Sequence, residues 1–386
     1  MYFFIDWDMI KTVEAEKIRR IFLLGAGHKT SHGTIYVQRV GDMWKLLESI
    51  SKIHPEFIDL VRRRLEILQS VEIHQPIGRR SLARQLNQTE RILRSEVELL
   101  ERQKLIQIHP AGMYLTREGK KVLNQIYPVI LPFYGLNDLE EMLKKELQIE
   151  EVYMVPGDSG QSEEVKREMG RIAGYYLKNN ILATDRIAIT GGTSMAALAE
   201  MVEVEHLYPD VMVCPARGGL GERVDTQANT IAAQLAKRLG GSYLLLQVPD
   251  QLSKEAYQSL CEEPYVRERV EEIQKSRLVF HGIGDAITMA KRRGASSEIL
   301  ELLKEKKAVS EAFGVYFDAE GEMVYQMPTI GLRWEDLKGK RCIAIAGGTH
   351  KAEAIRSLAK TKIFQVLITD EGAARAILHA SDSPAS

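Results

Sequence analysis

The sequence has few cysteines, no surplus of charge of either sign and no long apolar run. Cys214, Cys261 and Cys342 are far apart and odd in number, so we expect buried thiols in a reducing cytoplasm rather than disulfides or a metal site. Lys and Arg total 52 and Asp and Glu 53, so the net charge of −1 indicates no partner. No apolar run could span a bilayer, and Asp6 and Asp8 stand where an export signal needs apolar residues. We therefore expect a cytoplasmic protein with no membrane contact, metal or cofactor.

The length and the local charge suggest more than one kind of domain. The 386 residues predict two or three domains, and 45% apolar with 27% charged residues are normal for chains with buried cores. Residues 57–125 carry thirteen Lys or Arg against eight Asp or Glu, so this segment is basic although the whole chain is not. A basic module on an acidic body is a reason to expect contact with nucleic acid.

The basic segment has the element order of a winged helix-turn-helix. Apolar residues at helical spacing predict a helix over residues 58–71, a short helix capped by Ser81 and a longer helix over residues 90–103. A β-hairpin turning at Pro110-Ala111-Gly112 follows. Such modules insert the N-terminal end of the longer helix into the major groove. We therefore predict a DNA-binding domain over residues 43–125, although the same geometry occurs in domains that only pair proteins.

Polar side chains gather where the longer helix would meet DNA. Arg91 and Arg94 lie one turn apart and could reach base edges or phosphates, whereas Arg79 and Arg80 would contact phosphates. The predicted DNA-binding residues are Arg79, Arg80, Thr89, Arg91, Arg94 and Ser95. The stripe of this helix that faces the core is expected to comprise Ile92, Leu93, Val97 and Leu100. The alternative for each arginine is a solvated surface position.

The segments before and after the predicted DNA-binding domain give less specific predictions. Residues 1–42 are rich in turn-forming residues and show no helical or strand periodicity. The segment before Met43 could be a translated ribosome-binding site, so we expect Met43 to be the native start. The alternative is a small helix-and-strand extension. In residues 126–149, Pro128 and Pro132 are expected to break the regular structure, and leucines at helical spacing follow them. We expect a linker helix there, which either pairs subunits or packs on the larger domain.

Residues 150–386 predict an α/β domain. Apolar, β-branched strands alternate with helices, which indicates a Rossmann-like, doubly wound, mostly parallel sheet, with an added hairpin at residues 315–324. Five turn-rich loops follow predicted strands, at the sheet edge where such folds bind ligands. Two of these loops, Gly191-Gly192-Thr193-Ser194 and Gly347-Gly348-Thr349-His350, are near copies that each lead into an Ala-rich helix. A glycine pair before a helix N-terminus is typical of an anion cradle.

Two cradles at one sheet edge predict a phosphorylated ligand. Arg217 could bind a phosphate through both arms of its guanidinium group, and Lys351 would act as a point charge. Arg292 and Arg293 lie on a predicted helix and could close over the ligand, although for both a plain surface role is equally compatible with the sequence.

Catalytic machinery is not apparent in these loops. Gln227 and Glu311 could bind sugar hydroxyls, and His281 and His350 have no obvious carboxylate partner. Neither glycine loop has the spacing of a P-loop. One alternative is a sugar-phosphate isomerase or deaminase with a DNA-binding appendage, using Asp285 or Glu311 as its base. A pure oligomerisation scaffold would leave the five glycine loops unexplained.

Seven segments together resemble the SorC family of sugar-responsive repressors. They lie at residues 76–82, 190–193, 215–221, 227–230, 281–284, 311–314 and 369–374. The resemblance covers residues 43–378 and excludes residues 1–42. It implies a repressor of a glycolytic operon, an effector domain related to sugar-phosphate isomerases, and dimers or tetramers on operator DNA.

The resemblance also implies fructose 1,6-bisphosphate as the effector, whose two phosphates would match two cradles. The effector-binding residues that it implies are Gly191, Gly192, Thr193, Ser194, Arg217, Gln227, Arg292, Glu311 and Lys351. Release would follow from linkage, because a ligand that prefers one arrangement of the effector domains weakens operator binding to the other by the same factor.

Overall fold

The computed structural model describes residues 47, 49–54, 56–219, 223–249 and 252–382. The chain divides into two units, Met1–Ser49 and Ile50–Ser386, and the second contains all the helices and strands named below. The expectations for residues 1–42 lie outside the described residues. Among the helices that are described, none has the length and apolar character needed to cross a membrane.

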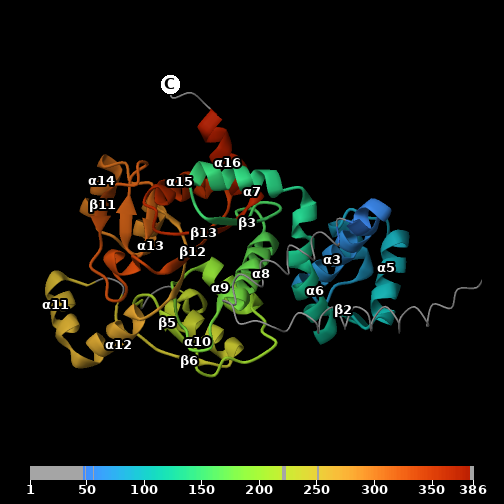
Figure 1. Cartoon of the computed structure of the whole chain (residues 1–386), viewed down its shortest axis with the longest axis horizontal. Helices are drawn as coiled ribbons and strands as arrows, with labels where there is room; N and C mark the ends of the chain where they lie inside the picture. Colours follow the sequence, from blue (N-terminus) through green and yellow to red (C-terminus); the bar gives the residue numbers. More distant parts are fainter. Residues whose placement is uncertain (1–46, 48, 55, 220–222, 250–251, 383–386) are drawn as a thin grey trace, which may run out of the picture. The chain divides into compact units, whose positions relative to one another are not determined.

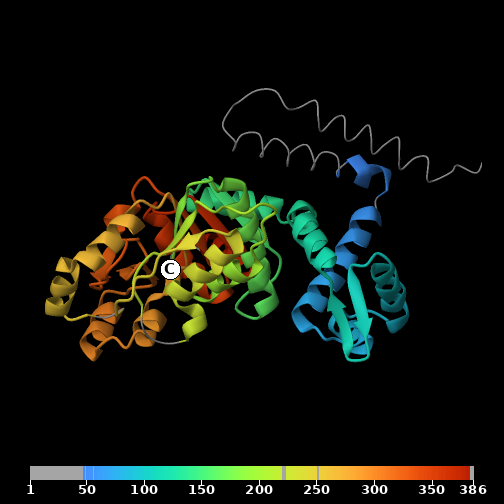
Figure 2. The ribbon, with the colours of Figure 1, turned by 90° about the horizontal axis from the view of Figure 1, so that it is seen from below.

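The predicted winged helix-turn-helix is present at the N-terminal side of this unit (Figure 1). Its elements are α3 (Glu56–His74), α4 (Arg79–Gln85), α5 (Glu90–Arg102), β1 (Ile106–His109) and β2 (Gly112–Leu115). Strands β1 and β2 pair antiparallel as the wing, drawn as two teal arrows in Figure 2, and Ile77 adds a bridge to Met113. The hydrophobic core of this module includes Leu68, Leu82 and Leu93.

Two details of this module differ from the prediction. Helix α4 begins at Arg79 after Gly78, not after Ser81, because the backbone of Gly78 is extended and the helical turn starts directly behind it. Ile92 is 46% exposed and does not belong to the inner stripe of α5. A helix advances 100° per residue, so Ile92 lies well to one side of the buried Leu93 and Val97.

The linker consists of two helices and a short turn. Helix α6 (Arg117–Ile130) is followed by the 3₁₀ turn η1 (Leu131–Tyr134) and by α7 (Asn137–Leu147). The expected break at Pro128 is wrong: α6 continues through it, with Tyr127 and Ile130 buried on either side. A proline so near the end of a helix removes one backbone hydrogen bond without displacing a long following segment. Leu143 of α7 packs in the core of the larger domain, which supports the packing alternative.

The larger domain is built on a parallel seven-stranded sheet, as predicted. Its strands are β3 (Glu151–Val155), β4 (Arg186–Ile189), β5 (Met212–Pro215), β6 (Ser242–Tyr243), β7 (Leu278–His281), β12 (Arg341–Ile345) and β13 (Val366–Asp370). Their order is β3-β13-β12-β7-β4-β5-β6, and every neighbouring pair is parallel. From β4 the chain proceeds outward through β5 and β6, whereas β7 lies on the other side of β4. The strand order therefore reverses between β4 and β7, which is where doubly wound sheets bind ligands.

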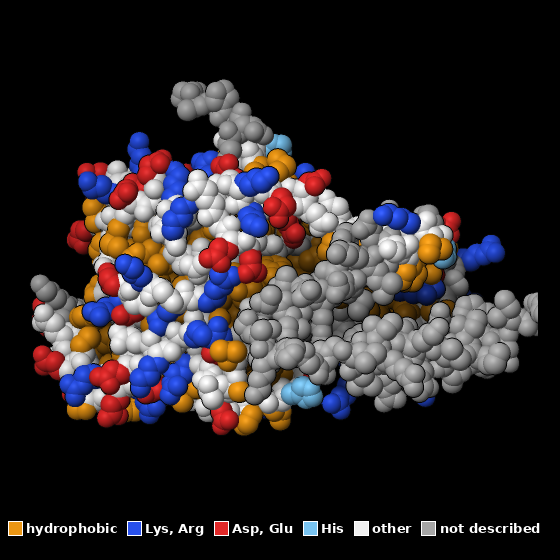
Figure 3. Space-filling view, viewed as in Figure 1, with side chains coloured by type: hydrophobic (Ala, Val, Ile, Leu, Met, Phe, Trp, Pro, Cys, Tyr) orange, Lys and Arg blue, Asp and Glu red, His pale blue; other side chains and the backbone are white. Residues whose placement is uncertain are grey.

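Helices cover both faces of the sheet. One layer contains α8 (Glu163–Asn180), α9 (Thr193–Met201) and α10 (Ala228–Leu239), and the other contains α7, α12 (Pro264–Gln274), α15 (Ala352–Lys360) and α16 (Glu371–Asp382). Successive strand residues face opposite layers, so that Ile187 and Ile189 join the first core while Ala188 joins the second. On the face visible in Figure 3, acidic and basic side chains are interspersed over the larger domain, in keeping with the balanced net charge.

A second, antiparallel sheet of four strands was predicted only as a hairpin. Its order is β11 (Met323–Gln326), β10 (Val315–Phe317), β9 (Ser310–Ala312) and β8 (Gly284–Asp285). The remaining helices are α11 (Lys254–Glu262), α13 (Ala286–Arg292) and α14 (Ser297–Glu305), and the remaining 3₁₀ turns are η2 (Val224–Thr226), η3 (Trp334–Leu337) and η4 (Thr349–Lys351). Cys214 and Cys342 are buried as expected, whereas Cys261 of α11 is exposed.

Candidate functional site

A cavity of about 870 Å³ opens at the carboxyl ends of the strands, where the strand order reverses. Loops after β3, β4, β5, β7 and β12 form its wall together with parts of α13 and the small sheet. All nine predicted effector-binding residues line it: Gly191, Gly192, Thr193, Ser194, Arg217, Gln227, Arg292, Glu311 and Lys351. The nine predicted positions are up to 160 residues apart, and only the parallel sheet brings them together around one cavity.

The loop after β4 has the form of an anion cradle. Gly192 has a φ of +119°, a conformation that residues with a Cβ rarely adopt, and a Cβ on Gly191 would lie 2.8 Å from the carbonyl oxygen of Thr226. Helix α9 starts directly afterwards and has no side-chain cap. The backbone N–H groups of its first turn therefore lack intrahelical partners and lie at the positive end of the helix dipole. Thr193 and Ser194 add hydroxyl groups to the same wall of the cavity.

The near copy of this loop after β12 is not a second cradle, which corrects the sequence prediction. The Gly348 amide donates to Asp370 Oδ2 at 2.7 Å, and the same oxygen accepts from the Ser159 amide at 2.8 Å. The Thr349 hydroxyl and amide both donate to Asp158, at 2.5 and 3.5 Å. Carboxylates of the protein itself therefore take the place that an anion would occupy. Gly348 still needs its φ of +94° to make this turn, which explains why the two loops look alike in sequence.

The loop after β12 contributes to the cavity through the side chain of Lys351. Its pKa is lowered by burial and further by the nearby charges of Lys166 and Arg292, while Asp370 opposes the shift. Lys166 and Arg292 line the same cavity. Three cations that repel one another around one space create a strong preference for an anionic ligand, because a bound anion would relieve the repulsion.

A second charged group lies on the wall formed by the small sheet. Glu311 of β9 is buried and accepts from Arg293 at 2.8 Å and from the Gly314 amide at 2.7 Å, while Arg217 lies 4.0 Å away. Burial opposes ionisation of Glu311, but Arg293 and Arg217 outweigh it and hold its pKa below the usual range. Glu311 is thus a fixed carboxylate that orients two arginines, and it retains acceptor capacity for a hydroxyl group.

Both candidate bases of the enzyme alternative make structural contacts in this fold. Glu311 is held ionised by its arginines, and Asp285 caps α13 by accepting from the Thr288 amide at 2.8 Å. Burial lowers the pKa of His281 to about 4, and its Nδ1 lies 3.1 Å from the Gly282 carbonyl oxygen. Within the described residues there is also no cluster of three or more side chains able to hold a metal ion.

Sequence reasoning missed Lys166, Ser162 and the loop after β3. Lys166 reaches the cavity from α8 and pairs with Glu163 at 2.5 Å. One lysine on an amphipathic helix carries no recognisable signal, because its nearness to Lys351 depends on how α8 packs across the sheet. Conversely, Arg293 turns out to be part of the site and not a plain surface residue.

The six predicted DNA-binding residues are all exposed on the winged helix-turn-helix. Arg94 pairs with Glu98 at 2.8 Å, Arg80 lies 3.7 Å from Glu90, and Thr89 caps α5 by accepting from the Ile92 amide. The Ser95 hydroxyl donates to the Ile92 carbonyl at 2.8 Å. Arg91 has no ion pair within the described residues, so its predicted contact with DNA would not require an ion pair to be broken first.

Comparison with known proteins supports both modules. The family model of a sugar-binding domain matches residues 132–379, and that of the CggR N-terminal DNA binding domain matches residues 60–130. The central glycolytic genes regulator of Priestia megaterium is 46% identical over 338 residues, which cover 87% of this chain and 99% of the relative. Its counterpart in Bacillus subtilis is 43% identical, with the same coverage. The chain belongs to the central glycolytic genes regulators of the SorC family.

Solved structures agree with this assignment. A SorC family transcriptional regulator from Enterococcus faecalis is 40% identical, covers 63% of this chain and all of that one, and superposes with a TM-score of 0.59. The full-length sorbitol operon regulator from Klebsiella pneumoniae covers 82% of this chain and 98% of its own at a TM-score of 0.60, and its 18% identity shows the common fold alone. This regulator thus combines a DNA-binding and a sugar-binding domain, and it is not an enzyme.

Proposed function

We propose that this regulator represses a glycolytic operon and is released from its operator by fructose 1,6-bisphosphate. The observation that carries the proposal is the cavity at the sheet edge, which holds one backbone anion cradle at α9 and a separate group of cations around Lys351. These are two centres of attraction for anions, and they replace the two equivalent cradles expected from the sequence.

A sugar with two phosphates fits both centres better than a monophosphate does. One phosphate would accept from the amides at the start of α9, and the other would lie among Lys166, Arg292 and Lys351. Gln227 and Glu311 line the same cavity and would supply polar groups for sugar hydroxyls. The DNA-binding module would act in the cytoplasm on operator DNA, as a dimer or tetramer, by analogy with the relatives' role in gene regulation.

The proposal is tested by measuring operator binding by fluorescence anisotropy while fructose 1,6-bisphosphate is titrated. Fructose 6-phosphate and glucose 6-phosphate serve as ligands with one phosphate. We expect the bisphosphate to raise the operator Kd at lower concentration than either monophosphate. It should also raise the melting temperature of the DNA-free protein, because a ligand that binds only the folded state stabilises it.

Variants locate the site. Lys351→Gln should weaken the response to the bisphosphate more than the response to a monophosphate, because it removes one of the two anion centres. Lys304→Gln is the matched control, since Lys304 is exposed on α14 outside the cavity. A protein that holds its operator equally well at every concentration of all three sugars would refute the proposed function.

A further inference from the structure

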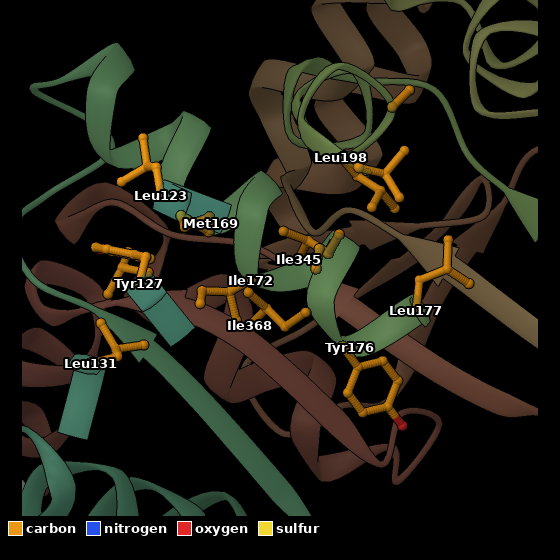
Figure 4. Packing of buried hydrophobic residues seen from close by; sticks show 14 of the residues in the cluster. Leu123, Tyr127, Leu131, Met169, Ile172, Tyr176, Leu177, Leu198, Ile345 and Ile368 are labelled. Atoms are coloured by element: carbon orange, nitrogen blue, oxygen red, sulfur yellow. The ribbon is translucent and has the colours of Figure 1, made fainter. Parts of the chain in front are cut away.

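A buried ion cluster joins the DNA-binding module to the larger domain. Arg171 of α8 donates to Glu72 of α3 and, at 3.0 Å, to Glu168 of its own helix. The Arg171 side chain is 2% exposed, and the two carboxylates are 11% and 9% exposed. Lys120 of α6 approaches Glu72 at 4.0 Å and bonds to Glu203 at 3.1 Å at the margin of the same contact. The surrounding apolar contact is visible in Figure 4, where Leu123 and Tyr127 of α6 lie close to Met169 and Ile172 of α8.

The helix that carries Arg171 also reaches the effector cavity. Ser162, Glu163 and Lys166 at the N-terminal end of α8 line the cavity, and Arg171 lies five residues further on. At a rise of 1.5 Å per residue, Lys166 and Arg171 are only about 8 Å apart along the helix axis. One rigid helix therefore touches the proposed ligand site with one end and the DNA-binding module with its middle.

Helix α8 also packs in close backbone contact with α9, the helix whose N-terminus forms the anion cradle. A Cβ on Gly170 would lie 2.5 Å from the backbone carbon of Ala197 in α9, and a Cβ on Gly174 would lie 3.0 Å from Cα of Val202. Such close backbone approach leaves no room for the two helices to slide past each other independently. A displacement of α9 by an anion at its N-terminus would therefore move α8 as well.

A contribution to folding stability does not by itself explain why this ion cluster is present. Burying charges costs desolvation free energy, which paired charges often only offset, and apolar side chains of similar volume are commonly as stabilising. Among the described residues, Arg171 Nη1 is buried without a hydrogen-bond partner, so the cluster is not even fully satisfied. What the pair of Arg171 and Glu72 does provide is a directional contact that fixes the DNA-binding module to α8 in one arrangement.

We propose that Arg171 is the positioning residue that couples effector binding to DNA release, through its ion pair with Glu72. Arg171 touches neither DNA nor the cavity, so it acts by holding α3, and with it the DNA-binding module, to α8. Ligand binding at the ends of α8 and α9 changes the position of this anchor, and operator affinity changes with it. The inference rests on the proposed release by a sugar phosphate and adds the route by which release occurs.

The test measures the ratio of operator Kd values with and without saturating fructose 1,6-bisphosphate in the full-length protein. In regulated proteins such ratios are about 5 to 150. Glu72→Gln removes the charge on the DNA-binding side, leaves Arg171 paired with Glu168, and should bring the ratio toward 1. Ligand affinity of the DNA-free variant, measured by calorimetry, should stay at the wild-type value because the cavity is intact.

Two further variants separate coupling from a merely structural role. Glu96→Gln is the matched control, since Glu96 is 12% exposed and pairs at 2.7 Å with Arg64 inside the same module; it should leave the ratio at the wild-type value. The double variant Glu72→Gln/Arg171→Met should lose no more coupling than Glu72→Gln alone if both residues act through their mutual bond. Because Glu72→Gln keeps the buried arginine paired, it tests the proposal even if variants of Arg171 fold poorly.

The outcomes distinguish this inference from the proposed function. If operator binding by the wild-type protein responds to none of the three sugar phosphates, the proposed function is wrong. There is then no ligand response that the ion pair could couple to DNA binding. If wild type responds and Glu72→Gln responds with the same ratio, the ion pair does not couple the modules and the inference alone is overturned. Loss of coupling in Glu72→Gln with retained ligand affinity supports it.

Discussion

The amide of Gly348 donates a 2.7 Å hydrogen bond to the buried carboxylate of Asp370. Asp370 is the last residue of β13 and accepts from two more backbone amides, that of Ser159 through the same oxygen and that of Ala373 through the other. One carboxylate thereby ties together the loops after β3, β12 and β13. This arrangement makes the sheet edge rigid beside the cavity, and it turns a loop with the sequence of an anion cradle into a structural element.

Asp370→Asn should therefore destabilise the protein. The amide nitrogen of asparagine cannot accept, so at least one of the three backbone donors stays buried and unpaired, at a cost of about 1–3 kcal/mol. Urea unfolding should show this as a lower free energy of unfolding. Asp210→Asn, at an exposed position, provides the control and should change stability by less than about 0.5 kcal/mol. Equal stability of the two variants would mean that the carboxylate is dispensable and that the loop could accept an anion.

The pH dependence of sugar phosphate binding should reveal Lys351. Its pKa is lowered in the free protein by burial and by Lys166 and Arg292, and a bound phosphate would raise it. Binding then takes up a proton once the pH exceeds the lowered pKa, so affinity should fall as the pH rises through the alkaline range. This range lies above the second pKa of a phosphate ester, at about 6, so the ligand charge is constant there.

Calorimetry in buffers of different ionisation enthalpy measures this proton uptake directly. Lys351→Gln should bind more weakly and show a flatter alkaline pH profile, whereas Lys304→Gln should retain the profile of wild type. An unchanged alkaline slope in Lys351→Gln would assign the titration to another group.

Arg91 should matter more for operator recognition than Arg94. Arg91 has no ion pair in the described part of the chain, whereas Arg94 must exchange its contact with Glu98 for one with DNA. Arg91→Ala should cost about 1–3 kcal/mol of specific binding if the guanidinium group reads a base, with a smaller effect on non-specific DNA. Operator titrations at several salt concentrations measure both effects. A larger loss from Arg94→Ala would show that the pair with Glu98 does not compete with DNA.

His281 should make the protein sensitive to acid. Burial between Phe313 and Phe364 lowers its pKa to about 4, against an ordinary value of 6.5 in the unfolded chain. The unfolded state therefore binds more protons between these values. Stability from this group is complete above pH 6.5 and is lost as the pH falls toward 4, by on the order of 3 kcal/mol.

The comparison with His281→Gln isolates this contribution from other acidic groups. The difference in unfolding free energy between pH 7 and pH 4.5 should be smaller in the variant than in wild type, since glutamine does not titrate. If both proteins lose the same stability over this interval, His281 does not carry the effect.

Several features of this regulator were determined by the sequence alone. The 3.6-residue period of α5 and the alternation of apolar strands with helices predicted both domains, because these patterns reflect local geometry that tertiary contacts only reinforce. From the glycines after β4 and the arginines of α4 and α5, the sequence also predicted where anions and DNA would bind, and these positions remain predictions.

Tertiary structure decided what the matching loops do. Gly191 and Gly348 lie in nearly identical segments, yet only the packing of β13 and of the loop after β3 brings Asp370 and Asp158 onto the second loop and leaves the first one open. Lys166 joins Lys351, and Arg171 meets Glu72, only because α8 crosses between the cavity and the DNA-binding module. Contacts between residues a hundred positions apart depend on how elements pack, and no local period in the sequence encodes them.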